Sequence, residues 1–102
     1  MIFLLGCDVR VPLAGVKVTS ITGAIVDASV AAVVSYTLYG ADGLPLATDV
    51  PLTFLSAGQF AFVVDKAVFA TQLAQSLGRI VVKFAENGAD SQWSDTVQFI
   101  NR

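Results

Sequence analysis

The chain contains no histidine and only one cysteine, Cys7. Without histidine, the Ser-His-Asp and Cys-His nucleophile arrangements are excluded, and so is the commonest transition-metal ligand. Cys7 has no partner for an intrachain disulfide, and no second thiol or imidazole to share a zinc ion with it. We therefore interpret Cys7 as a small apolar residue and expect the chain to fold without disulfide staples.

Charge is scarce as well. Asp, Glu, Lys and Arg make up 14% of the 102 residues, against about 25% in an average soluble protein, and the mean hydropathy is +0.72. The formal net charge is −2. The basic residues are scattered and form no cluster that could neutralise phosphates, so a nucleic-acid partner is not expected. A β domain with so little charge is expected to cover part of its surface with other protein.

Long apolar runs are also missing. No stretch approaches the roughly 18 residues of a membrane-spanning helix, because Ser, Thr, Gly and Gln interrupt the longest uncharged segments, Ala28–Ala41 and Val50–Val64. Leu4-Leu5-Gly6-Cys7 resembles the cleavage box of a bacterial lipoprotein, but no Lys or Arg precedes it and its apolar run is shorter than a signal core. We therefore expect no membrane partner and interpret Ile2–Leu5 as an edge strand.

What the chain has in abundance is strict alternation of apolar residues, which predicts β-strands. The segments with this pattern are Ile2–Leu5, Asp8–Thr19 with a kink at Gly15, Val30–Tyr39, Leu44–Ala47, Leu52–Leu55, Phe60–Val64, Arg79–Glu86 and Trp93–Ile100. Val30–Tyr39 is apolar on both faces in its first half, so we expect it to be central. Pro12 and Pro45 cannot donate to a β-ladder and place their strands at sheet edges.

The segments between these strands are predicted as follows. Turns are expected at 40–43 and 56–59, a connection at Ile21–Ser29, a break at Asp49–Pro51, a tight turn at Asn87-Gly88 that extends into a loop over Ala89–Gln92, and a bend near Trp93–Asp95. Within Lys66–Leu77, the residues Phe69, Leu73 and Leu77 recur at helical spacing and predict about three helical turns, which Gly78 would end.

These elements predict a single all-β domain over residues 1–102. The expected fold is an immunoglobulin-like antiparallel β-sandwich of about seven strands, with one short helix or crossing segment around residues 66–77. The Cys…Trp…Cys spacing of antibody domains is absent, so the prediction is an immunoglobulin-like domain and not an antibody domain.

The carboxylates do not form a catalytic pattern. Most of them, such as Asp42 and Asp49, occupy turn positions, where Asp bonds to its own backbone. Glu86, Asn87 and Asp90 could offer oxygen ligands to calcium, but they lack the regular spacing of a calcium loop. A glycosidase needs two acids roughly 5–10 Å apart in a cleft, which a sandwich of this size does not suggest. We predict no enzyme activity, no metal and no cofactor.

Ten residues are aromatic, and strand periodicity places Phe60, Phe62, Phe84 and Phe99 in the core. Other side chains lie near strand ends, on the crossing segment or on the uncharged first strand, whose edge is a template for pairing with another chain. These candidate interface residues are Ile2, Phe3, Leu4, Tyr39, Phe69 and Trp93. For the four aromatic ones, core packing is the alternative.

A second candidate contact is a whole sheet face. Ala31, Val33, Val81 and Ala85 lie opposite the positions predicted to face inward. Loops could cover this face, or it could pack on a neighbouring subunit.

Several turn-and-strand motifs carry a family resemblance. They are Thr22–Val30, Tyr36–Leu46, Pro51–Phe54, Ser56–Phe60 and Gly88–Trp93. Over roughly Val11–Phe99 the chain resembles small immunoglobulin-like virion proteins of tailed bacteriophages and prophages. Lys66–Leu77 departs from the family, which usually has a shorter, Gly-containing loop there. The family has no established active site, so none is carried over.

The resemblance implies a non-enzymatic virion component that is made in the host cytoplasm. The expected role is a capsid decoration or cement protein, present as a homo-oligomer or in many copies, with the major capsid protein as partner. A neck or tail accessory protein, with neck or tail proteins as partners, is the alternative. A module that binds carbohydrate, a cell surface or a peptide is a further alternative, for which Gln92-Trp93 with Asn87 and Asp90 offers the one suitable loop. A periplasmic or adhesin domain would need a signal sequence that the chain does not show.

Overall fold

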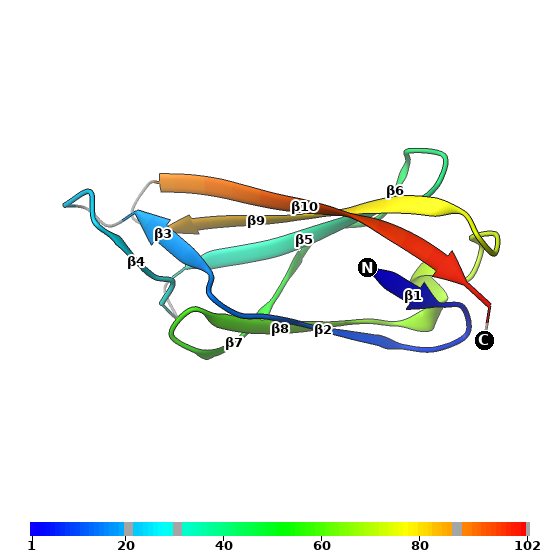
Figure 1. The fold of residues 1–102 in the computed structure, drawn as a ribbon, viewed down its shortest axis with the longest axis horizontal. Helices are drawn as coiled ribbons and strands as arrows, with labels where there is room; N and C mark the ends of the chain where they lie inside the picture. Colours follow the sequence, from blue (N-terminus) through cyan, green and yellow to red (C-terminus); the bar gives the residue numbers. More distant parts are fainter. Residues whose placement is uncertain (20–21, 30–31, 87–88, 102) are drawn as a thin grey trace.

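The computed structural model describes residues 1–19, 22–29, 32–86 and 89–101. Figure 1 shows two sheets that face each other along an elongated molecule of 46 × 24 × 16 Å. The larger sheet has the order β1-β10-β9-β5-β6, and the smaller has the order β2-β8-β7. A two-stranded ribbon, β3-β4, extends one end. The predicted fold class, an all-β sandwich, is confirmed.

The strands of the larger sheet are β1 (Ile2–Leu4), β10 (Ala89–Ile100), β9 (Leu77–Glu86), β5 (Val33–Tyr39) and β6 (Pro45–Pro51). The smaller sheet contains β2 (Val9–Leu13), β8 (Gln59–Val64) and β7 (Thr53–Ser56), and the ribbon contains β3 (Lys17–Thr19) and β4 (Ile25–Asp27). All pairs are antiparallel except β1 with β10, which is parallel. The two sheets correspond to the division of an immunoglobulin sandwich, in which strands C, F and G lie opposite strands B, E and D.

Pro12 and Pro45 lie at sheet edges, as predicted from the N–H that each of them lacks. Pro12 is in β2 and Pro45 in β6, and each of these strands is at the edge of its sheet. β5 lies between β9 and β6, as expected of the most apolar strand. Gly15 adopts a positive φ of 71° between β2 and β3, so the predicted kink is the point where the chain leaves the smaller sheet.

Four predicted connections differ from the structure. Ile21–Ser29 contains strand β4, which pairs with β3. Asp49–Pro51 does not break the chain but belongs to β6, where Asp49 takes a φ of 49° and the register shifts. Ala89–Gln92 is strand, and β10 runs unbroken through Trp93–Asp95. Asn87 and Gly88 lie outside the described residues.

The predicted three-turn helix is wrong. A single 3-10 turn, η1 (Lys66–Phe69), follows Asp65, whose carboxylate accepts a hydrogen bond from the Ala67 N–H at 2.8 Å. Phe69 is 0% exposed, whereas Leu73 is 77% exposed, so the apparent helical spacing does not describe one buried face. The chain beyond η1 joins the larger sheet, because the Phe99 N–H of β10 donates to the Ser76 carbonyl at 3.0 Å.

Gly78 has a packing role and does not end a helix. A Cβ at this position would lie 2.3 Å from the Tyr39 carbonyl oxygen and 2.8 Å from Phe99 Cε2. Only glycine allows β9 to approach β5 and the Phe99 ring this closely.

Aromatic side chains join the two sheets. Tyr36 from β5 stacks on Phe62 from β8, with ring centroids 4.3 Å apart. At the end of the sandwich that carries β1, Phe3, Phe69 and Phe99 form a triangle of rings with centroid separations of 5.3, 6.1 and 5.9 Å. All three rings of the triangle are completely buried, so this cluster closes one end of the core.

The outer face of the larger sheet is mixed. Val33 is 71% exposed, as expected for an outward position, but Val81 is only 6% exposed and its neighbour Thr37 only 3%. Asp49 bonds to Thr37 through the Asp49 N–H and the Thr37 hydroxyl oxygen at 3.1 Å. The middle of this face is therefore partly covered within the chain. Ala31 lies outside the described residues.

We predict that Phe69→Ala lowers the free energy of unfolding by about 3–5 kcal/mol, because it removes one of the three rings of a fully buried aromatic cluster and leaves a cavity. Leu73→Ala, in the same connection but exposed, should change it by less than about 0.5 kcal/mol. Urea unfolding of both variants measures this difference. Equal losses would mean that the segment packs through both residues, as a helix would.

Burial raises the pKa of the Tyr36 phenol above its ordinary value of 10.0. The unfolded chain then releases this proton at a lower pH than the folded chain, so stability is retained below about pH 10 and falls as the pH rises further. Urea unfolding from about pH 8 to about pH 11 should show this loss in the wild type. Tyr36→Phe should lose less stability over the same range. Parallel curves for the two proteins would contradict the assignment.

Candidate docking surface

Exposed apolar side chains gather on the outer face of the larger sheet at its β1 end. Ile2 pairs with Gln98 in β10, and Gln98 pairs with Leu77 in β9, so these three residues form one row across the sheet. Leu4 lies beside Ile100 in the next row. Ile2 is 57% exposed, Leu4 42% and Leu77 58%. We call Ile2, Leu4, Leu77 and Ile100 the β1-end patch.

Tyr39 borders this patch. It pairs with Arg79, which is two residues along β9 from Leu77. A shallow hollow of about 340 Å³ is lined by Tyr39, Leu77 and Arg79, together with the turn at Gly40–Gly43. The half-buried Tyr39 side chain and the exposed Leu77 side chain thus line one hollow, so an aromatic side chain lies next to the aliphatic ones of the patch.

The six predicted interface residues divide into three groups. Ile2, Leu4 and Tyr39 come together on the surface just described. Phe3 and Phe69 are 0% exposed; they pack inside the core and offer no surface, because the inward parity of β1 and the closure of η1 direct both rings to Phe99. Trp93, which is 39% exposed, lies nearer the other end of β10.

Leu77 was missed as a surface residue. It shares the outward parity of Arg79 and Lys83 on β9, and this alternation was the available signal. Its position four residues after Leu73 assigned it to the predicted helix instead.

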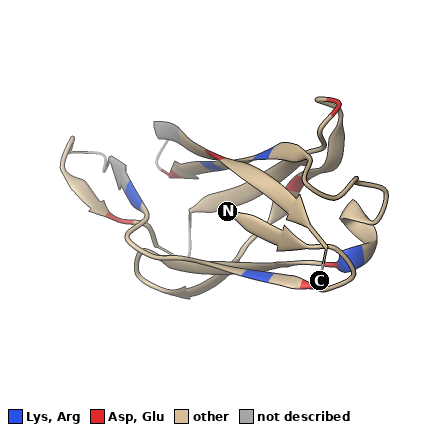
Figure 2. Cartoon of the chain, turned by 45° about the vertical axis from the view of Figure 1, so that its right-hand side comes forward, with Lys and Arg blue, Asp and Glu red and all other residues tan. Residues whose placement is uncertain are grey.

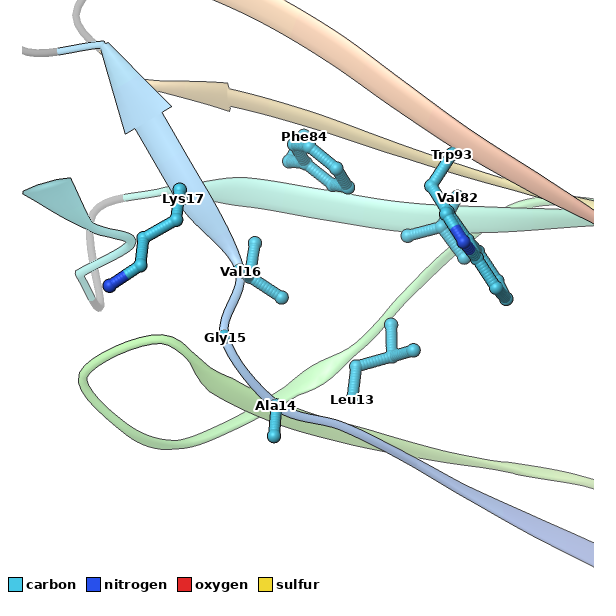
Figure 3. A pocket seen from close by; sticks show the side chains of 8 residues that line it. All are labelled: Leu13, Ala14, Gly15, Val16, Lys17, Val82, Phe84 and Trp93. Carbon is cyan, nitrogen blue, oxygen red and sulfur yellow. The ribbon is translucent and has the colours of Figure 1, made fainter. Parts of the chain in front are cut away.

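A second hollow lies between the sheets at Trp93, as Figure 3 shows. It has a volume of about 310 Å³, and its apolar lining includes Leu13, Val16, Val82, Phe84 and Trp93. Val16 is held in the wall by two hydrogen bonds, from its N–H to the Gly58 carbonyl at 3.0 Å and from the Ala28 N–H to its carbonyl at 2.9 Å. The wall of the hollow on the β2–β3 side is therefore well anchored.

Charged groups are spread over the molecule, as Figure 2 shows. Three ion pairs occur among the described residues: Lys17 with Asp27, Lys83 with Asp49 at 3.9 Å, and the Met1 ammonium with Asp95 at 3.4 Å. Exposed pairs of this kind contribute about 0–1 kcal/mol each. They shape the surface locally and do not create a strong field.

Of the three residues whose oxygens were considered as calcium ligands, only Glu86 has a described side chain. The Glu86 carboxylate accepts a hydrogen bond from the Ser29 hydroxyl and so ties the end of β9 to the connection between β4 and β5. Asn87 and the Asp90 side chain lie outside the described residues. Within the described ranges no three His, Cys, Asp or Glu side chains are close enough to hold a metal ion, and no helix there has the length and hydropathy to span a membrane.

No protein-family model, no curated protein and no solved structure matches the chain.

Proposed function

We propose that this chain is a non-enzymatic structural protein of a phage particle, a capsid decoration protein that docks through the β1-end patch. The single observation that carries the docking surface is the clustering of Ile2, Leu4 and Leu77 on one sheet face, each more than 40% exposed. Apolar side chains that gather at a sheet edge mark protein contacts.

The sandwich suits such a role physically. Leu4 and Ile2 are presented by a strand whose inward residue, Phe3, is locked in the aromatic triangle. The patch is therefore rigid before it binds, and little conformational entropy is lost on docking. The low charge of the chain keeps the desolvation cost of a large contact small.

The proposal of a phage particle rests on the family resemblance of the turn motifs. The proposed partner of the chain, the major capsid protein, rests on the same resemblance. Docking on the major capsid protein is the leading form of the proposal, with many copies per particle. Docking on neck or tail proteins uses the same patch, and the experiment below separates the two.

A carbohydrate-binding role finds less support. Trp93 lies in strand β10 and not on an open loop, and the hollow that it lines is aliphatic or aromatic apart from Lys17. Sugar recognition relies on a few polar groups placed beside an aromatic ring.

We predict that Leu77→Asp lowers the affinity of the chain for the docking partner at least about tenfold, because a carboxylate would be buried in an apolar contact. Leu55→Asp on β7 is the matched control, since Leu55 is 50% exposed and lies on the other sheet. Both variants should keep the wild-type circular dichroism spectrum and melting temperature within a few degrees.

The measurement is cosedimentation with assembled heads, and separately with purified tails, of the phage that encodes the chain. Binding to heads that Leu77→Asp weakens and Leu55→Asp does not supports the decoration role. Binding to tails alone moves the proposal to the accessory role. A chain that sediments with neither particle contradicts both.

A further inference from the structure

β10 is much longer than the strand that covers its outer edge. It spans Ala89–Ile100, whereas β1 has three residues and pairs only with Gln98, Phe99 and Ile100. On its other side β10 pairs with β9 along most of its length. Among the described residues, no strand pairs with the remaining edge of β10; β3 lies near the beginning of β10 but pairs only with β4.

The backbone groups that face this edge belong to even-numbered residues. The Gln98 N–H donates to the Met1 carbonyl at 2.9 Å, and the Ile100 carbonyl accepts from the Leu5 N–H at 2.8 Å. Since alternate residues of a strand direct their N–H and C=O groups to the same side, Gln92 and Ser94 direct theirs to this edge too. Unsatisfied edge groups of this kind are templates for another strand.

The hollow at Trp93 lies directly beside that edge. Trp93, between Gln92 and Ser94, points to the inner side of the sheet, where it meets Val82; Leu13 and Val16 form the opposite wall (Figure 3). A cavity of roughly 150 Å³ is enough for a benzene ring, and this hollow has about 310 Å³. The sandwich thus lacks both a strand and the side chains that the strand would place between the sheets.

We propose that this site, the β10 acceptor edge, binds an extended strand from another polypeptide. The incoming strand pairs with the edge of β10 at Gln92 and Ser94 and inserts bulky apolar side chains into the hollow beside Trp93. It ends before Thr96, whose carbonyl accepts from the Met1 ammonium at 3.0 Å and whose N–H donates to the Asp95 carboxylate at 2.9 Å.

The occupant is a strand because the site continues an existing strand pairing. β1 runs parallel to β10 with Ile2 beside Gln98. In this register, a strand continued backwards from Met1 would pass Thr96 and then lie along Ser94 and Gln92. Edge groups that recur at every second residue match only an extended backbone. The alternation of that backbone sends every second side chain into the hollow and the others outward.

The charges of the edge indicate what the strand carries and argue against a second copy of β10. β10 contains Asp90 and Asp95 and no basic residue, and the Asp95 carboxylate already attracts the Met1 ammonium at 3.4 Å. Two β10 strands paired in register, in the parallel direction that β1 takes, would set Asp95 beside Asp95, which is unfavourable across a strand pair. A strand with alternating bulky apolar residues and a flanking Lys or Arg is complementary.

This inference goes beyond the proposed function, because the acceptor edge and the β1-end patch are separate surfaces. Either can fail while the other stands.

A tethered strand tests the acceptor edge without knowledge of the natural partner. The full chain is extended immediately before Met1 with Lys-Ile-Thr-Ile-Thr, whose isoleucines share the inward parity of Met1 and Phe3 and would enter the hollow. The matched control, Lys-Thr-Ile-Thr-Ile, has the same composition with the isoleucines in outward register. Tethering supplies a high effective concentration, so even weak pairing is detected.

Trp93 reports occupancy, because it is the only tryptophan of the chain and is 39% exposed. We expect the inward-register extension to shift its fluorescence emission to shorter wavelength and to raise the melting temperature by about 5 °C or more. The outward-register control should show neither effect. Equal emission and melting temperature for both extensions and the wild type would overturn the proposal.

Ser94 separates strand pairing from simple apolar contact. Ser94→Pro removes the edge N–H but is tolerated where that N–H does not serve the sheet, and Ser94→Ala keeps it. In the inward-register chain, Ser94→Pro should abolish the emission shift and Ser94→Ala should retain it; retention by both would overturn strand pairing. Light scattering on the wild type completes the test, since a dimer that Ser94→Pro dissociates would make a second copy the occupant and overturn the assignment to another polypeptide.

Discussion

The burial of Phe3 against Phe69 and Phe99 is the contact on which the surface features of this domain depend. These rings close one end of the core. Because side chains alternate along a strand, an inward Phe3 forces Ile2 and Leu4 outward, onto the face that Leu77 shares. The same anchoring holds the three-residue β1 against the last residues of β10. The β1-end patch is therefore a consequence of a single buried ring, and the same ring fixes where β1 lies along β10.

The interior and the surface of this sandwich differ in how polar and apolar groups are placed. Inside, aromatic pairs such as Tyr36 and Phe62 join the sheets, and no fully buried side-chain nitrogen or oxygen among the described residues lacks a hydrogen-bond partner. Outside, exposed aliphatic side chains are common and charges are few. Exposed apolar surface of this kind lowers solubility, and a partner protein that covers it would remove this effect. Low charge and a patch supported by rigid β-strands both favour the proposal that this domain binds other protein.

The segments Lys66–Leu77 and Arg79–Glu86 differ in how well their apolar periodicity matches the structure. In Arg79–Glu86 the period of two continued over a whole strand, and Ile80 and Val82 are completely buried as it predicts. In Lys66–Leu77, three apolar residues at helical spacing predicted a helix, yet Phe69 belongs to the core, Leu73 to the surface and Leu77 to a strand. Three apolar residues are too few to show that one continuous face is buried. Tertiary contacts decided their roles. Ser76, next to Leu77, accepts a hydrogen bond from Phe99 in β10, and Phe69 packs against the rings of Phe3 and Phe99.

The sequence by itself determined the all-β class, the edge positions of Pro12 and Pro45, the central place of β5 and the inward faces of β8 and β9. These follow from local rules: a missing N–H, a period of two, and apolar residues on both faces. Only the tertiary structure decided that Phe3 and Phe69 are core residues, that Ile2, Leu4 and Leu77 share a patch, and that Trp93 borders a hollow beside an open edge. These features depend on which strands become neighbours and on how far each pairing extends. Such long-range contacts produce no periodic pattern in the amino-acid sequence.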